Sequence, residues 1–136
     1  MDWTACVNKS LAKKAKTDTN LLISLKKSSA KKLESERLLV LNDTTAASKV
    51  SLAYDALREI LESLAIKNGY KIYNHECYTA FLKEIMNESA IADKYDRFRK
   101  IRNAINYYGK DITPGEAEPV LAEIRELVEK INSLLV

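Results

Sequence analysis

Glycine and proline are scarce in this chain, since its 136 residues include three glycines and two prolines. A β-sandwich or barrel needs frequent turns, and turns are rich in these two residue types. Hydrophobic residues make up 46% of the chain and charged residues 30%, which is typical of a folded domain rather than a disordered one. The composition therefore favours one all-α domain that spans residues 1–136.

Long apolar segments are missing as well. No run approaches the roughly 18 residues needed to cross a bilayer. The first 16 residues are polar and lysine-rich, without the apolar centre of a signal peptide. The amphipathic segments described below are accounted for by the core of a bundle, which leaves none for a membrane surface. We therefore expect a cytoplasmic protein that does not contact membranes.

Cysteine and histidine are too few for several common kinds of site. Cys6 and Cys77 have neither a metal-binding spacing nor the pattern of a disulfide framework, so no disulfide is expected, in keeping with a reducing cytosol. His75 is the only histidine, and a histidine in the first turn of a helix is more often structural than catalytic. The sequence has no P-loop, Rossmann, zinc or GxSxG motif. We expect no metal and no cofactor.

Positive charge is in slight excess, with a formal net charge of +3 and a pI of about 8.8. This balance is compatible with an RNA ligand but does not require one. The segment 1–18 is expected to be either a short amphipathic helix or a basic arm. Terminal lysines more often serve solvation than nucleic-acid contact. The lysines of this segment are Lys9, Lys13, Lys14 and Lys16.

Apolar residues recur every three or four positions in several segments, the spacing of a buried helix face. The clearest segment is 45–68, and Gly69 follows it in the position that often ends a helix. Its apolar face consists of Ala47, Val50, Tyr54, Leu57, Leu61 and Leu64. Other helices are expected over 21–41, 75–88, 91–109 and 120–135. In the first of these, the residues expected to face solvent are Lys31, Lys32, Glu34 and Glu36.

The connections between these helices are short, and short connections place successive helices antiparallel. Thr113, Pro114 and Glu116 match the capping box of the last helix, while Pro119 is expected to kink it. The segment from Tyr70 to Asn74 is expected to be a loop. The fold expected is an all-α, up-and-down antiparallel bundle of four to five helices plus a short N-terminal helix.

The helix expected over 91–109 has two distinct faces. Apolar residues follow one face, and we place Tyr108 at the end of this face in the core. A polar stripe about 100° wide follows another face. Asparagine is a poor helix former, so two asparagines in this stripe suggest a surface kept for a ligand as readily as a solvated one. The stripe consists of Arg99, Arg102, Asn103 and Asn106.

Two stretches together resemble the HEPN domain, a prokaryotic and archaeal family of helical bundles. They are AYDALREILESLAIKNGYKIYNHECYTAFL, residues 53–82, and FRKIRNAINYYGKDI, residues 98–112. The family signature is an arginine followed after four to six residues by a histidine, often with asparagine directly after the arginine. Arg102 and Asn103 match this signature, but Tyr107 stands where the histidine is expected.

The resemblance implies several properties. Many HEPN proteins are metal-independent ribonucleases that dimerise so that the motif helices of two chains line one cleft. The histidine is thought to handle the proton of the RNA 2′-hydroxyl, and the arginine holds the scissile phosphate. Many members are toxins paired with a minimal nucleotidyltransferase that acts as antitoxin. Others have lost the motif and serve as binding or assembly modules.

The tyrosine at position 107 favours binding over cleavage. A general base works best with a pKa near the operating pH, and tyrosine ordinarily titrates about 3.5 pH units above histidine. The favoured hypothesis is a HEPN-like homodimer that binds RNA or a nucleotide without efficient cleavage, as partner of a nucleotidyltransferase. Its catalytic candidates are Arg102 and Tyr107. Its binding candidates are Arg99, Asn103, Asn106 and Lys110.

Two alternatives stay open. In the first, the protein is a ribonuclease in which Tyr107 or His75 replaces the usual histidine. In the second, the polar stripe is a structural or dimer contact, with Arg102 paired to a carboxylate such as Asp96 or Glu76.

Overall fold

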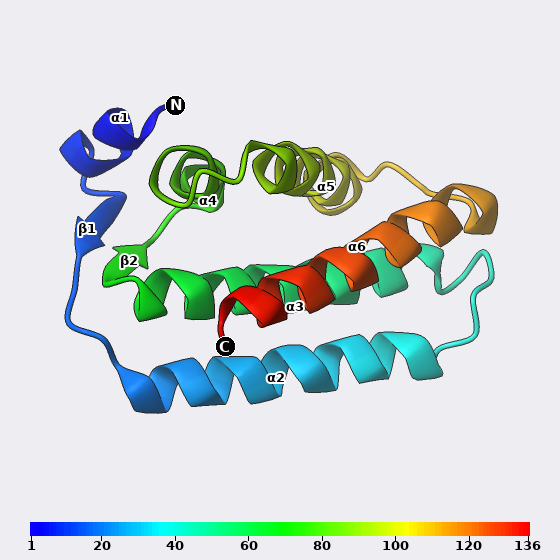
Figure 1. Ribbon diagram of the computed structural model, residues 1–136. Helices are drawn as coiled ribbons and strands as arrows, with labels where there is room; N and C mark the ends of the chain where they lie inside the picture. Colours follow the sequence, from blue (N-terminus) through cyan, green and yellow to red (C-terminus); the bar gives the residue numbers. More distant parts are fainter.

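A computed structural model describes all residues of the chain, 1–136, and its helices form a bundle (Figure 1). The helices are α1 (Trp3–Asn8), α2 (Thr19–Leu38), α3 (Ala46–Lys67), α4 (His75–Ala80), α5 (Ser89–Tyr108) and α6 (Pro114–Leu134). A π-helical turn, η1 (Phe81–Ile85), continues α4. The all-α bundle expected from the sequence is confirmed. None of these helices combines the length and the apolar character needed to span a membrane.

Helix α3 lies at the centre of the bundle. In Figure 1, α2 runs antiparallel to α3 along one side, α6 runs beside α3, and α4 and α5 are seen nearly end-on above them. The core-facing side of α3 is completely buried from Ala53 to Leu64, as its apolar spacing predicts. Burial of this stripe stabilises the fold, because apolar surface removed from water contributes about 25 cal/mol per Å².

Short local signals determine where the helices begin and end. Asp18 caps α2, with its carboxylate accepting a hydrogen bond from the backbone N–H of Leu21 at 3.0 Å. The capping box of Thr113 and Glu116 starts α6 as predicted. Helix α6 continues through Pro119 rather than starting after it, because a proline near the first turns removes only one hydrogen bond. Gly109 ends α5 with φ of 63°, a left-handed conformation that glycine adopts without strain.

A small antiparallel ribbon was not expected from the sequence. Strand β1 (Ala12–Lys14) pairs with β2 (Tyr70–Ile72), with Lys13 directly opposite Lys71. Two further backbone hydrogen bonds extend the pairing, from Tyr73 N–H to Leu11 O and from Ala15 N–H to Gly69 O, each at 2.8 Å. The sequence assigned these segments to an N-terminal arm and a loop, because three-residue strands carry too little periodicity to be recognised.

Helix α1 is attached to α4 by a disulfide between Cys6 and Cys77. The expectation of no disulfide is therefore wrong. The two cysteines are 71 positions apart in the sequence, and the ribbon folds α1 back onto α4 so that both side chains are buried there. Trp3 packs beside them, against the rings of Tyr70 and Phe81.

Two further expectations about burial are wrong. Glu36, expected to face solvent, is fully buried and forms ion pairs with Lys49 and Arg125. Tyr108, expected in the core, is 84% exposed because it is the last residue of α5 and no other element covers it. Helical spacing tells which residues share a face, but it does not tell whether that face reaches a partner at the end of the helix.

Candidate functional site

A polar cleft of about 340 Å³ lies where the start of α4 meets the second half of α5. Residues 73–76 form one wall, and residues of the polar stripe on α5 form the other. The lining consists of Tyr73, Asn74, His75, Glu76, Arg99, Arg102, Asn103 and Tyr107. Four of the residues singled out on α5 thus meet the only histidine of the chain, which lies more than twenty positions earlier in the sequence.

The wall that carries His75 is shaped by a helix cap. The side chain of Asn74 accepts hydrogen bonds from the backbone N–H groups of Glu76 at 2.9 Å and Cys77 at 3.3 Å. These bonds fix the first turn of α4, and His75 is the first residue of that helix. The disulfide at Cys77 fastens the same turn to α1. The histidine is therefore held by a rigid part of the backbone.

Arg102 lies between two tyrosine rings. Its guanidinium carbon is 5.3 Å from the ring centre of Tyr54 and 5.5 Å from that of Tyr107. Its Nη1 donates a hydrogen bond to the Tyr107 hydroxyl at 3.2 Å. The side chain is 15% exposed, its Nε has no partner, and its nearest carboxylate, that of Asp55, is 3.9 Å away. The guanidinium is thus oriented by aromatic contacts. Its Nε is buried and out of reach of a ligand, whereas its Nη2 makes no hydrogen bond and is free for an anion.

Arg99 is bound more tightly within the protein. Its Nε and Nη2 both donate to Oδ1 of Asp96, at 3.1 and 2.8 Å. Partial burial acts to raise the pKa of Asp96, but hydrogen bonds from Arg99 and Lys100 outweigh burial and hold this pKa below its usual value. Arg102 does form an ion pair with a carboxylate, as one alternative expected, but the partner is Asp55 rather than Asp96 or Glu76, because Arg99 takes Asp96.

His75 belongs to a chain of hydrogen bonds that reaches into the core. Its Nδ1 lies 2.9 Å from the hydroxyl of Tyr54, which lies 2.9 Å from the hydroxyl of Tyr95. The Tyr95 hydroxyl donates to the backbone carbonyl of His75, also at 2.9 Å. These three bonds need three protons, and the two hydroxyls supply two of them. The third must be on Nδ1, so the chain selects the tautomer in which Nε2 carries the lone pair.

The ring of His75 is also kept neutral. Burial lowers its pKa to about 4, with further lowering by the positive charges of Arg58, Arg102 and Arg99. At pH 7 the imidazole is therefore uncharged. Since Nδ1 is engaged with Tyr54 and Nε2 makes no hydrogen bond, Nε2 is a proton acceptor without a partner.

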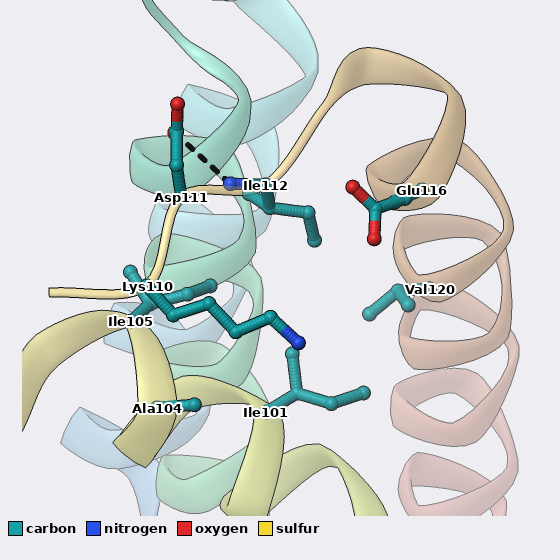
Figure 2. A pocket seen from close by; sticks show the side chains of 8 residues that line it. All are labelled: Ile101, Ala104, Ile105, Lys110, Asp111, Ile112, Glu116 and Val120. Carbon is teal, nitrogen blue, oxygen red and sulfur yellow. Dashed lines mark hydrogen bonds between the residues drawn. The ribbon is translucent and has the colours of Figure 1, made fainter. Parts of the chain in front are cut away.

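Two of the predicted binding residues lie outside this cleft. The side-chain oxygen of Asn106 accepts a hydrogen bond from the Ser51 hydroxyl at 3.1 Å. Lys110 stretches across a separate hollow of about 240 Å³ between α5 and the start of α6, and Figure 2 shows its side chain above Ile101 and opposite Val120. Five of the eight residues that line this hollow are hydrophobic, so it lacks the convergent donors of the cleft.

Sequence reasoning did not place His75 beside the polar stripe of α5 and did not identify the tyrosines that contact it. A weak signal was present, because Tyr54 places a hydroxyl within an otherwise apolar stripe, and a buried hydroxyl needs a partner. No group of three or more histidine, cysteine, aspartate or glutamate side chains is arranged to hold a metal ion. Comparisons of the chain with protein-family models, curated proteins and solved structures give no significant match.

Proposed function

We propose that the cleft binds a phosphodiester group of RNA and cleaves the RNA chain there. The observation that carries this proposal is that a neutral imidazole with an unused Nε2 and a guanidinium whose Nη2 makes no hydrogen bond line one cleft. RNA carries its own nucleophile, the 2′-hydroxyl, beside each phosphate. A base for that hydroxyl and a cation for the phosphate are therefore the main groups that such a reaction needs.

In the proposed reaction, His75 accepts the proton of the 2′-hydroxyl at Nε2 while the 2′-oxygen forms a bond to phosphorus. The bond between phosphorus and the 5′-oxygen breaks as Tyr107 donates its phenol proton to that oxygen. Tyr107 is free to donate because its oxygen already accepts the hydrogen bond from Arg102. The products are a 2′,3′-cyclic phosphate and a 5′-hydroxyl, and solvent then carries the proton from His75 back to Tyr107.

Arg102 and Asn103 bind rather than exchange protons. The guanidinium of Arg102 neutralises charge that builds on the phosphoryl oxygens, which is a large term in a partly buried site. The amide of Asn103 makes no side-chain hydrogen bond within the protein and lines the same cleft, so it is available to a sugar or base edge. Arg99 adds positive charge through the part of its guanidinium that Asp96 does not engage.

RNA binding without efficient cleavage, which the sequence favoured, is the second candidate. It is supported by the pKa of about 4 at His75, since so weak a base accepts a proton less readily than an ordinary imidazole. Glu76, the one carboxylate that lines the cleft, would also repel a phosphate that came close to it.

The HEPN resemblance adds a homodimer and a nucleotidyltransferase partner to the proposal. The Cys6–Cys77 disulfide counts against the cytoplasmic location expected from the sequence, because disulfides are rare in the reducing cytosol. Tyr107 and Tyr108, 67% and 84% exposed, present a large aromatic surface at the end of the helix that lines the cleft. A second copy or a partner protein would cover such a surface. Light scattering of the pure protein tests the dimer, and identification of proteins that co-purify from the native host tests the partner.

The experiment that tests the main proposal uses purified protein, single-stranded RNA and a divalent-metal chelator. We expect fragments that end in a 2′,3′-cyclic phosphate, and we expect Arg102→Ala and His75→Ala to produce them far more slowly. The matched control is Arg97→Ala, because Arg97 is on the same helix but forms an ion pair with Glu123 outside the cleft. Binding that depends on Arg102 without cleavage would favour the second candidate. Cleavage at the parent's rate in both cleft variants would reject the main proposal.

A further inference from the structure

The ribbon beside the cleft carries positive charge that the protein does not neutralise. Lys13 and Lys71 are directly opposite each other in the β1–β2 pairing, and both are exposed. Neither forms an ion pair within the chain. Like charges placed opposite each other in a two-stranded ribbon repel, so the strand pairing itself gives no reason for two lysines at these positions.

Tyr73 lies beside both the cleft and these two lysines. Its ring lines the cleft and is 53% exposed. The ammonium groups of Lys13 and Lys71 each lie 5.9 Å from the centre of that same ring. An exposed aromatic face thus lies between the arginines of the cleft and the lysines of the ribbon.

The backbone holds this arrangement in place. The N–H of Tyr73 donates to Leu11 O at 2.8 Å, so Tyr73 continues the ladder that contains Lys71. The next residue, Asn74, caps α4 and thereby fixes His75. Lys13 comes from a distant part of the sequence, and the ribbon brings it beside Tyr73.

We propose that Lys13, Lys71 and Tyr73 form a second binding surface for single-stranded RNA, continuous with the cleft. This inference rests on the proposed function. The substrate is then a polynucleotide of several residues, not a free nucleotide. The ring of Tyr73 stacks on a base next to the scissile phosphate, and the flexible lysine side chains turn from the ring to the neighbouring phosphates.

Single-stranded RNA fits this surface better than other anionic partners. An exposed ring between cations is the arrangement that binds unpaired bases together with their phosphates. A membrane surface would require an apolar helix face beside the cations, and the ribbon does not present one. An acidic peptide would use the lysines but would have less use for the exposed face of Tyr73.

The test is fluorescence anisotropy with labelled RNA whose 2′-hydroxyls are methylated, so that it binds but is not cleaved. We compare a dinucleotide with an oligonucleotide of about eight residues, a length within the range of single-strand binding sites. For the longer RNA, Lys13→Gln/Lys71→Gln should weaken binding about tenfold and lower the salt slope by about 1.4, which corresponds to two phosphate contacts. Dinucleotide binding should not change.

The matched control is Lys27→Gln/Lys31→Gln, which removes two exposed lysines without ion pairs from α2 and should leave both RNAs unaffected. Tyr73→Ala should weaken binding of the longer RNA, and Tyr73→Phe should restore it. Circular dichroism verifies that each variant is folded.

If the ribbon variant binds the longer RNA as the parent does, while Arg102→Ala does not, the second surface is rejected and the proposed function stands. If Arg102→Ala also binds normally, the proposed function fails as well. Equal loss of binding to RNA, an acidic peptide and anionic vesicles in the ribbon variant would reject an RNA-specific surface, because charge alone would then explain the result.

Discussion

Two clusters of charged side chains in this molecule differ in how completely their hydrogen-bond donors and acceptors pair with one another. In the first, the fully buried Glu36 accepts a hydrogen bond from Nε of Arg125 at 3.0 Å and lies 3.1 Å from Nζ of Lys49. Lys49 also donates to the carbonyl of Leu39 at 2.6 Å, near the end of α2. The second cluster is the cleft, where Nη2 of Arg102 makes no hydrogen bond and lies 3.9 Å from the nearest carboxylate, that of Asp55.

The comparison shows that charge alone does not identify a functional site. A cluster whose donors and acceptors pair with one another connects helices, here α2, α3 and α6, and leaves nothing for a ligand. The second cluster leaves hydrogen-bond donors and the basic nitrogen of His75 without partners beside an open cleft. Incomplete pairing costs free energy, and a bound ligand can recover it.

The largest expected effect comes from a substitution in the first cluster. Glu36→Ala leaves Lys49 buried without its carboxylate, and loss of one partner of a buried ion pair costs about 3–5 kcal/mol in the free energy of unfolding. Urea unfolding followed by circular dichroism measures this loss. Glu34→Ala is the control, because Glu34 is exposed and its ion pair with Arg37 is loose at 3.9 Å. A loss below 1 kcal/mol for Glu36→Ala would mean that this cluster contributes little to folding.

The next largest effect comes from a substitution in the second cluster that leaves the protein folded. His75→Ala removes the base and should lower the cleavage rate about 10²–10⁴-fold, the usual contribution of a positioned base. RNA affinity should change far less, because Arg102 remains. If cleavage by His75→Ala equals that of the parent, Nε2 is not the base.

Removal of the disulfide affects only the wall of the cleft that carries His75, because the bond joins α1 to α4. Cys6→Ser/Cys77→Ser should lower the free energy of unfolding by about 2–4 kcal/mol, because the bond closes a loop of about 70 residues in the unfolded chain. Thermal unfolding with and without reductant measures the effect. The melting temperature of the serine variant should not respond to reductant, whereas a parent that also gives no response would show that the bond does not form.

Lowering the pH should reduce folding stability and cleavage through protonation of His75. The unfolded chain binds a proton there near pH 6.5, but the folded protein binds it only near pH 4, so folding stability falls as the pH drops from 6.5 to 4. His75→Asn should make stability less dependent on pH within this window. Cleavage by the parent should fall as the pH passes below about 4. An NMR titration of the imidazole measures the pKa directly, and a value near 6.5 would contradict this account.

The smallest expected effect tests the hydrogen-bond chain behind His75. In Tyr95→Phe the Tyr54 hydroxyl loses its acceptor and donates to Nδ1, which moves the imidazole proton to Nε2. One hydrogen bond is worth about 0.5–1.5 kcal/mol, so cleavage should fall up to about tenfold with RNA affinity unchanged.

Nitrogen-15 chemical shifts of the imidazole report the tautomer in this variant. Tyr78→Phe is the matched control, because the Tyr78 hydroxyl is buried beside Tyr95 and has no hydrogen-bond partner. An unchanged tautomer in Tyr95→Phe would show that the tyrosine chain does not orient His75.

The interpretation of individual residues from the sequence was uneven. On α5, Arg99, Arg102, Asn103 and Asn106 were singled out by helical spacing and Tyr107 by the HEPN resemblance. All of these except Asn106 line the cleft. Lys13 was interpreted as a solubilising residue of a terminal arm. Its position opposite Lys71 depends on a ribbon of three residues per strand, which has no periodicity to detect.

The sequence by itself determined the all-α class, most helix ends and the polar stripe on α5, since spacing, caps and turn residues act within a few positions of one another. Only the tertiary structure decided that Cys6 meets Cys77, that Glu36 is buried and that His75 lies beside Arg102. The physical reason is that these contacts arise from how whole helices pack. Packing of that kind depends on the summed burial of many side chains rather than on any local pattern.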